Sequence, residues 1–261
     1  MTENPNFCFC GLALGKRYRN CAIDLGKDLQ KYHPGVTYLI LTDDPKDFRG
    51  LPNVLPIKHK QDSIMFPYHD RRFAFEQALL RFEVAIQIDT DIRILKPLTI
   101  PPDVINLKCL VGRTENLREH INKYQKQNLP IYSKIAEKLD IPFSEVLYVG
   151  EFIFAVAKNN GKEMDFIKHW GVIARYLELH RIHGADGPAI GLAAAKAGLE
   201  VIHSDWPSTI QRDYVDHLKF SSGKNKQEKS FFEQIRFKIN YHYRLNKARL
   251  LAMKSFDFYY D

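Results

Sequence analysis

The sequence lacks several features that would assign it to a membrane or to an oxidising compartment. It has no run of about 18 apolar residues, so no membrane span is expected, and its polar start at Met1–Asn6 does not resemble a secretory signal. Cysteine is scarce, and the four cysteines have neither disulfide-framework nor metal-site spacing. Cys8 and Cys10 would share one face of a buried strand as small apolar residues. We therefore expect a cytoplasmic protein with reduced cysteines.

Acidic residues are scarce in one part of the chain only. Residues 217–254 hold ten Lys or Arg and two Glu, a net charge of +8, whereas the whole chain carries +7. All other residues together therefore carry −1. We expect a near-neutral main domain at residues 1–216 and a separate basic segment at residues 217–261. A chain of 261 residues with 45% hydrophobic content is long enough to bury a sizeable core.

Hydrophobic periodicity predicts an α/β fold with a mixed, mostly parallel sheet flanked by helices. Phe7–Leu14 and Val36–Leu41 have the composition of buried strands, and Arg19–Tyr32 between them carries apolar residues at helical spacing. A strand, a helix and a second strand in this order indicate a βαβ unit. Further strands are expected at Val54–Lys58, Val84–Ile88, Cys109–Gly112, Leu147–Ala157 and Leu199–His203, and further helices at Tyr68–Phe82, at 115–140 in two pieces, at Glu163–His180 and at Asp186–Gly198.

The main functional signal is a pair of aspartates at the end of an apolar strand. Val84–Ile88 is followed by Asp89-Thr90-Asp91. Residues i and i+2 of a strand point to the same side, and open α/β sheets bind ligands at the carboxyl ends of their strands. Two carboxylate ligands that leave the rest of the coordination shell free for water and substrate phosphates suit Mg²⁺ or Mn²⁺. Such a triplet also occurs by chance, so the alternative is two solvated aspartates in a polar turn.

The order of the motifs resembles a known family. A βαβ unit ending in Leu41-Thr42-Asp43-Asp44-Pro45 precedes a helix with Arg71-Arg72 and the Asp-x-Asp strand. The strand Val149–Phe154 and the helix start His183-Gly184-Ala185-Asp186 follow. This arrangement is similar to nucleotide-sugar-dependent glycosyltransferases of the GT-A fold, and locally to the blood-group A and B transferases and bacterial lipopolysaccharide transferases. The resemblance covers roughly residues 7 to 206.

The resemblance implies a sugar transfer from a nucleotide-diphosphate donor, most commonly a UDP-sugar, to the hydroxyl of a glycan or glycolipid acceptor. Asp43 would contact the base or the ribose of the donor. Alternatively, Asp43 is only a turn residue before a proline and has no contact with the donor. One arginine of the pair would meet the donor, and the resemblance favours Arg72 over Arg71. Asp89 and Asp91 would hold a Mn²⁺ or Mg²⁺ ion that neutralises the leaving diphosphate.

Two carboxylates compete for the catalytic role. Asp186 falls where the family places a carboxylate beneath the reacting sugar, as a general base or as a group that stabilises or traps the sugar carbon. Alternatively, Asp186 has no catalytic role and is a carboxylate that the dipole at a helix N-terminus stabilises. Retaining relatives show Asp-Glu there and inverting ones Glu-Asp or Asp-Asp, whereas this chain has Ala-Asp, so the stereochemical course stays open. Glu151 is the rival, because a charge inside an apolar strand is either exposed or functional.

The segment after residue 216 predicts a flap. Asp216-His217-Leu218-Lys219 and Gly223-Lys224 combine an imidazole, two cations and a flexible glycine, which would suit closure over a diphosphate. His217 is the first candidate for the third metal ligand and His203 is the second. Lys219 and Lys224 would contact the donor phosphates. The alternative for either histidine is an ordinary surface or packing residue.

The basic segment also predicts an amphipathic helix. Phe231, Ile235 and Ile239 recur at helical spacing among the basic residues of 229–254. Such a helix is typical of peripheral contact with an anionic membrane, here the inner face, where a glycolipid or surface polysaccharide would be the acceptor. The alternative is a helix packed on the main domain with its basic face in water.

Parts of the sequence are also compatible with two other functions. A sugar nucleotidyltransferase would need a Gly-rich phosphate loop, of which Gly11-Leu12-Ala13-Leu14-Gly15 is only a thin version. Aromatic and basic residues of the last segment could stack on and pair with nucleic acid. No nucleic-acid module is recognisable and the main domain is not basic, so no nucleic acid is expected as a partner.

Overall fold

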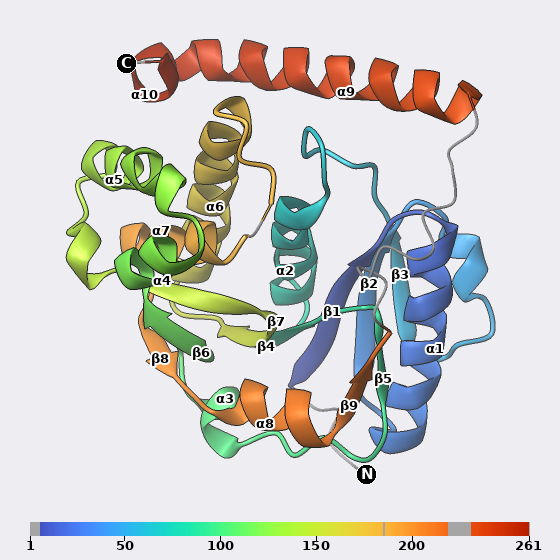
Figure 1. Ribbon diagram of the computed structural model, residues 1–261. Coiled ribbons are helices and arrows are strands. Elements are labelled where there is room, and N and C mark those ends of the chain that lie inside the picture. The colour runs from blue at the N-terminus through green and yellow to red at the C-terminus, as the bar shows by residue number, and fades with distance from the viewer. Residues whose placement is uncertain (1–5, 185, 219–230, 261) are drawn as a thin grey trace.

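The computed structural model describes residues 6–184, 186–218 and 231–260. Its centre is a seven-stranded sheet in the order β3-β2-β1-β4-β7-β6-β8 (Figure 1). Neighbours run parallel from β3 to β4, β7 is antiparallel to both of its neighbours, and β8 is parallel to β6. The mixed, mostly parallel sheet predicted from the sequence is thereby confirmed. Its strands are β1 (Phe7–Ala13), β2 (Thr37–Thr42), β3 (Val54–Lys58), β4 (Val84–Ile88), β6 (Leu110–Asn116), β7 (Leu147–Ala157) and β8 (Val201–His203).

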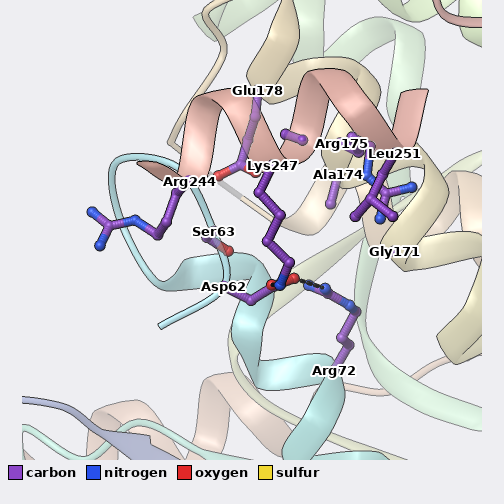
Figure 2. Close-up of a pocket in the computed structure, with 11 residues that line it drawn as sticks. Asp62, Ser63, Arg72, Gly171, Ala174, Arg175, Glu178, Arg244, Lys247 and Leu251 are labelled. Atoms are coloured by element: carbon purple, nitrogen blue, oxygen red, sulfur yellow. Dashed lines mark hydrogen bonds and ion pairs between the residues drawn. The ribbon is translucent and has the colours of Figure 1, made fainter. Parts of the chain in front are cut away.

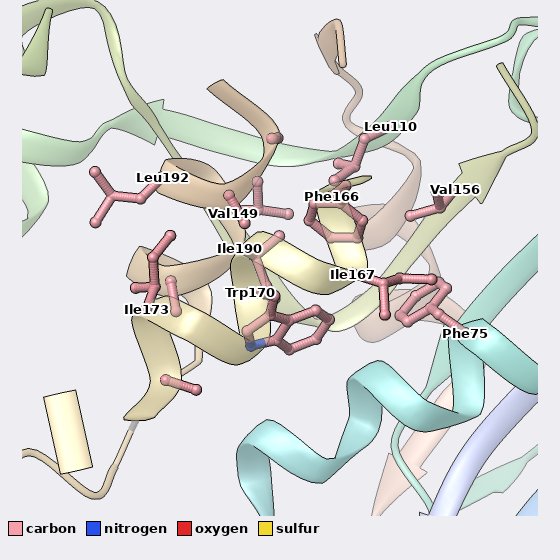
Figure 3. Packing of buried hydrophobic residues seen from close by; sticks show 14 of the residues in the cluster. Phe75, Leu110, Val149, Val156, Phe166, Ile167, Trp170, Ile173, Ile190 and Leu192 are labelled. Atoms are coloured by element: carbon pink, nitrogen blue, oxygen red, sulfur yellow. The ribbon is translucent and has the colours of Figure 1, made fainter. Parts of the chain in front are cut away.

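Helices cover both faces of the sheet and create two apolar cores. Alternate residues of a strand enter opposite cores: Cys8 and Cys10 of β1 lie on one face, as expected, and Phe9 on the other. Figure 3 shows the first core, where Phe75, Phe166 and Trp170 pack together from two helices. The helices are α1 (Lys16–Tyr32), α2 (Arg71–Leu79), α3 (Pro102–Asn106), α4 (Leu117–Tyr124), α5 (Leu129–Lys138), α6 (Lys162–Leu179), α7 (Gly187–Ala197) and α8 (Trp206–Asp213).

Residues 214–218 return to the aspartates. A second, two-stranded sheet pairs β5 (Ile92–Ile94) with β9 (Val215–His217), and His217 lies opposite Ile92. The Leu218 backbone N–H donates to the Asp91 carbonyl oxygen at 2.9 Å. The predicted boundary between residues 216 and 217 therefore falls inside a strand, and His217 is part of the α/β body.

A long helix lies across one side of the molecule (Figure 1). It comprises α9 (Phe231–Ala252), followed by a 3₁₀ turn (Met253–Ser255) and α10 (Phe256–Tyr260). Its end is anchored, because Ala252 and Tyr259 are buried with the first core. Its outer side carries exposed apolar residues such as Ile239 and Leu250. The tail thus packs on the domain and also presents an apolar face to solvent.

Candidate active site

A cavity of about 530 Å³ lies where β1 and β4 end. The Asp-x-Asp turn, Arg71 at the start of α2 and His217 of β9 form its polar walls. Tyr18 of α1, with Phe66 and Tyr68 from the segment before α2, supplies aromatic walls. This is the carboxyl edge of parallel strands, where open α/β sheets bind ligands.

The two aspartates occupy a turn between β4 and β5, and both line this cavity. The Asp89 backbone N–H donates to Phe152 O at 3.1 Å, which ties the turn to β7. Burial raises the pKa of Asp89 to about 6, although the neighbouring Arg71 acts in the opposite direction. Asp89 and Asp91 therefore border the same cavity, as predicted. They do so from a turn and not from one continuous strand.

Arg71 connects three acidic residues from different elements. Its Nη2 lies 2.7 Å from Asp89 Oδ1, and its Nη1 lies 3.6 Å from Asp186 Oδ1. The same Nη1 donates to the Glu151 carbonyl oxygen at 3.4 Å. The structure therefore brings three predicted site residues, Asp89, Glu151 and Asp186, together around one guanidinium.

Arg72, the arginine that the resemblance favoured for the donor, does not line this cavity, whereas Arg71 does. Arg72 donates to His69 O at 2.7 Å and pairs with Asp62 at 3.1 Å. It also packs against Gly171 of α6, and it does not line the cavity. Successive residues of an α-helix point about 100° apart, so only one of the pair can face the cavity, and that residue is Arg71.

Asp186 and Glu151 lie side by side but differ in access. Asp186 is fully buried, and neither carboxylate oxygen has a hydrogen-bond partner among the described residues. Burial and the adjacent Glu151 raise the pKa of Asp186 well above its usual value. Glu151 Oε1 accepts the Gly187 backbone N–H at 2.8 Å, and Glu151 also lines a second cavity. Only Glu151 of the two can therefore reach a bound molecule.

The close approach of α7 to β7 produces this pair. A Cβ at Gly191 would overlap the backbone oxygen of Leu147, and one at Gly187 would collide with Tyr148 and Val149. Glycine at both positions lets the helix touch the strand. Asp186, just before the helix, is thereby set beside Glu151.

The second cavity has a volume of about 260 Å³, and Glu151 and Phe152 of β7 are among its lining residues. The Phe152 ring lies 4.8 Å from the His217 ring, which borders the first cavity. In the second cavity His120 stacks on Tyr148 with 3.6 Å between ring centroids, and His120 Nδ1 lies 2.6 Å from Glu115 Oε1. The cavity thus combines flat aromatic surface with polar groups, on the far side of β7 from the aspartates.

The chemistry of the first cavity suits a divalent cation that is shared with a ligand. His217 Nε2 is buried and has no hydrogen-bond partner within the described chain, and it borders the same space as Asp89 and Asp91. Carboxylate oxygens are ligands of both Mn²⁺ and Mg²⁺, whereas an imidazole nitrogen is a ligand of transition-metal ions and not of Mg²⁺. No three His, Cys, Asp or Glu side chains in residues 6–184, 186–218 and 231–260 form a ready-made metal cluster. A cation here would therefore need ligands from a bound phosphate or water.

The remaining predicted residues lie elsewhere. Asp43 accepts hydrogen bonds from Arg19 at 2.7 Å and from the Gly15 N–H at 3.0 Å. Burial tends to raise the pKa of Asp43, but these bonds outweigh it and lower the pKa. Asp43 thus fixes the turn after β1 and does not line the cavity. His203, on β8, bonds with Thr114 and is half-exposed. Lys219 and Lys224 lie outside the described residues.

Sequence reasoning missed the aromatic walls. Tyr18, Phe66 and Tyr68 come from the first turn of α1 and from the segment before α2, which are far apart in the chain. The one available signal was the Phe66-Pro67-Tyr68 cluster shortly before Arg71. Gln87 was also missed: it is buried in β4, lines the cavity, and its Oε1 has no hydrogen-bond partner in the part of the chain described.

No protein-family model matches the chain, and no curated protein matches its sequence. Solved structures do match. The galactosyltransferase LgtC, in complex with donor and acceptor sugar analogs, superposes with a TM-score of 0.51 at 13% identity, over 75% of this chain and 72% of LgtC. The chain has the fold of this galactosyltransferase. The apo structure of the bifunctional glycosyltransferase WbbM gives a TM-score of 0.47 at 12% identity, over 78% of this chain and 39% of WbbM. The GT-A type of fold predicted from the sequence is confirmed by the likeness to LgtC.

Proposed function

We propose that the protein is a glycosyltransferase that moves a sugar from a nucleotide-diphosphate donor, UDP-linked in the first instance, to a hydroxyl of a glycan or glycolipid acceptor. The observation that carries this proposal is a pair of cavities whose lining residues contact each other: Arg71 of the first donates to the Glu151 carbonyl oxygen of the second at 3.4 Å. The first cavity holds paired carboxylates, an arginine and aromatic rings, and the second holds aromatic and polar groups, among them the Glu151 carboxylate. Two neighbouring sites of this kind are what a two-substrate transfer needs.

The first cavity would take the donor. The rings of Tyr18, Phe66 and Tyr68 offer apolar faces to the flat base. Asp89 and Asp91, with His217 in the case of Mn²⁺, would hold a Mn²⁺ or Mg²⁺ ion, which would neutralise charge on the leaving diphosphate. The cation-to-ring distance from Arg71 to Tyr68 is 6.0 Å, so both belong to the same wall. Contacts from Asp43, Lys219 or Lys224 to this donor remain predictions.

Glu151 would act at the reacting atoms. One of its oxygens is held by the Gly187 N–H, and its side chain borders the second cavity. In that position it could accept the acceptor hydroxyl proton or stabilise the positive sugar carbon. Buried Asp186 would act indirectly: it lies 3.6 Å from Arg71 and helps to hold the guanidinium near Asp89. We therefore assign the contact with substrate to Glu151 and positioning of Arg71 to Asp186.

The outer face of α9 supports the predicted contact with an anionic membrane. Ile235, Ile239, Tyr243, Leu250 and Met253 are exposed, and basic residues lie along the same helix. An apolar stripe flanked by cations is typical of helices at a lipid surface. Within the described ranges no helix is long and apolar enough to cross a membrane. Part of the predicted interval, 229–230, lies outside the described residues.

Thermal unfolding with UDP, GDP, ADP or CDP, each with MnCl₂ or with EDTA, tests the donor site. A ligand at 100 times its Kd adds about 2.7 kcal/mol to the free energy of unfolding. We expect a metal-dependent shift with one nucleotide, lost in Asp91→Ala and kept in Asp24→Ala, whose aspartate is on the surface of α1. Absence of a shift with all four nucleotides would contradict the proposal. Release of pyrophosphate in place of a nucleoside diphosphate would instead indicate a nucleotidyltransferase.

A further inference from the structure

The 59–70 segment, which joins β3 to α2, has two contrasting ends. At one end Phe66 and Tyr68 form the aromatic wall of the donor cavity, and their rings lie 5.8 Å apart. At the other end Asp62 contacts Lys247 of α9 (Figure 2), and the Ile64 carbonyl oxygen accepts from Arg244 of the same helix. The segment therefore connects the C-terminal helix to the donor cavity.

Two side chains of α9 hold the outer end. Lys247 Nζ lies 2.6 Å from Asp62 Oδ1, and Asp62 Oδ2 is 3.1 Å from Arg72 Nη2 (Figure 2). Arg244 Nε donates to the Ile64 carbonyl oxygen at 3.0 Å. On its other side, the Ile64 N–H donates to Glu178 Oε1 at 2.8 Å. Ion pairs and hydrogen bonds from α9, α2 and α6 therefore hold Asp62 and Ile64 in place.

Hydrogen bonds join the start of the segment to its end. Asp70 is fully buried and accepts hydrogen bonds from the backbone N–H groups of Asp62 and Ser63 at 2.8 and 2.9 Å. It also accepts from the Ser63 hydroxyl and lies 2.8 Å from His59 Nε2. These bonds tie the start of the segment to its end, directly before Arg71. A shift of Asp62 would therefore move the Phe66–Tyr68 wall and the start of α2.

We propose that Arg244 and Lys247 are positioning residues for the donor cavity: they hold the 59–70 segment so that its aromatic wall is in place before the nucleotide binds. This inference rests on the proposed function of that cavity. The two residues do not touch the cavity. The C-terminal helix also has anchors other than these two residues, because Ala252 and Tyr259 are buried in the first core. A wall that is already in place lowers the entropic cost of binding, so the nucleotide binds with a lower Kd.

The test is calorimetric titration of the full chain at 25 °C with whichever of UDP, GDP, ADP and CDP binds the wild type, in MnCl₂. Lys247→Ala and Arg244→Ala should each raise Kd roughly three- to tenfold, the effect of losing one partly exposed charged hydrogen bond. Lys247→Arg should restore wild-type affinity. Lys238→Ala is the matched control, because Lys238 is exposed on the same helix and has no contact with the 59–70 segment in the described structure.

A second readout separates positioning from general stability. In the free protein, hydrogen exchange of residues 59–68 should accelerate in Lys247→Ala and Arg244→Ala but not in Lys238→Ala. If Arg244→Ala does not fold, Arg244→Gln replaces it, whereas half-exposed Lys247 should tolerate truncation. Folded variants that bind the nucleotide within twofold of wild type would overturn this inference and leave the proposed function standing. A wild type that binds none of the four nucleotides would overturn both.

Discussion

At the scale of single residues, the site is organised by one arginine among carboxylates. Arg71 lies within 3.6 Å of oxygens of Asp89 and Asp186, and it also donates to the backbone of Glu151. Buried acids without a cation would be costly, and one of them, Asp186, has no hydrogen-bond partner in the described chain. Arg71 therefore compensates buried acids and at the same time lines the first cavity.

Replacing Arg71 with Ala should lower the free energy of unfolding by about 3 kcal/mol at neutral pH, because it leaves buried acids uncompensated. Urea unfolding measures this change, with Arg81→Ala as the control because Arg81 is an exposed arginine just after α2. Adding Asp186→Asn to Arg71→Ala should recover part of the loss, because an amide can be buried without a neighbouring cation or a bound proton. A double variant no more stable than Arg71→Ala would contradict this account.

Glu151→Gln and Asp186→Asn should separate the two carboxylates. We expect Glu151→Gln to reduce kcat at least about 100-fold with little change in donor affinity, which is the range of a lost acid–base or charge-stabilising group. Asp186→Asn should alter donor affinity more than Glu151→Gln does, because it acts through Arg71. Steady-state kinetics and nucleotide titration measure both quantities. Equal loss of kcat in both variants with unchanged donor affinity would argue that Asp186 also acts at the reacting atoms.

At the scale of elements, close contacts set the site. The helix α7 lies directly on β7 because positions 187 and 191 carry no side chain. The helix α6 supplies Glu178, a buried acid that accepts the Ile64 N–H. Each contact fixes a segment that borders one of the cavities, so we expect changes in packing here to alter the site.

Gly191→Ala should destabilise the protein by about 2 kcal/mol or more, because the new methyl group overlaps the Leu147 backbone. Gly184→Ala is a matched control, since a Cβ there would have open space and no left-handed backbone. We expect it to change stability by less than about 0.5 kcal/mol. Urea unfolding of both variants measures the difference, and equal stability would mean that α7 can move away from β7 without cost.

Glu178 should make stability depend on pH. Burial raises the pKa of Glu178 from 4.5 to about 8, so the folded protein favours the neutral acid. The contribution of neutral Glu178 to the stability of the folded protein is fully present below pH 4.5 and is lost as pH rises through about 8. Glu178→Gln should therefore gain stability relative to wild type as pH increases from 5 to 8. Chemical denaturation at several pH values measures this, with the surface variant Glu137→Gln as control; parallel pH profiles for wild type and Glu178→Gln would contradict it.

At the scale of the whole molecule, the C-terminal helix has two faces with different roles. Its inner face contacts the 59–70 segment and the first core, and its outer face is apolar and basic. Both alternatives drawn from the sequence, a packed helix and a membrane-contacting helix, are therefore compatible in one structure. Deleting the whole segment would expose core residues, so point substitutions on the outer face are the better probe.

Ile239→Glu and Leu250→Glu should abolish cosedimentation with vesicles that contain phosphatidylglycerol, because a buried apolar contact is replaced by a charge that the anionic surface repels. Leu80→Glu is the matched control: Leu80 is 63% exposed, comparable to Ile239 at 63% and Leu250 at 67%, but lies at the end of α2. Wild type should bind phosphatidylcholine vesicles more weakly. Undiminished binding by both α9 variants would remove the membrane role.

Most strands and helices of the main sheet could be predicted from the sequence, because hydrophobic period and composition are local properties. The short elements β5, β9, α3 and α8 were not predicted. The sequence placed β3 and β7 at their observed bounds, and it located the aspartates at the end of β4. Only the tertiary structure decided that Arg71 and not Arg72 faces the cavity. It also decided that His217 joins the aspartates through β5–β9 pairing, and that Phe66 and Tyr68 form a wall. Periodicity fixes how side chains are spaced on one element, whereas packing between distant elements fixes which of those side chains meet.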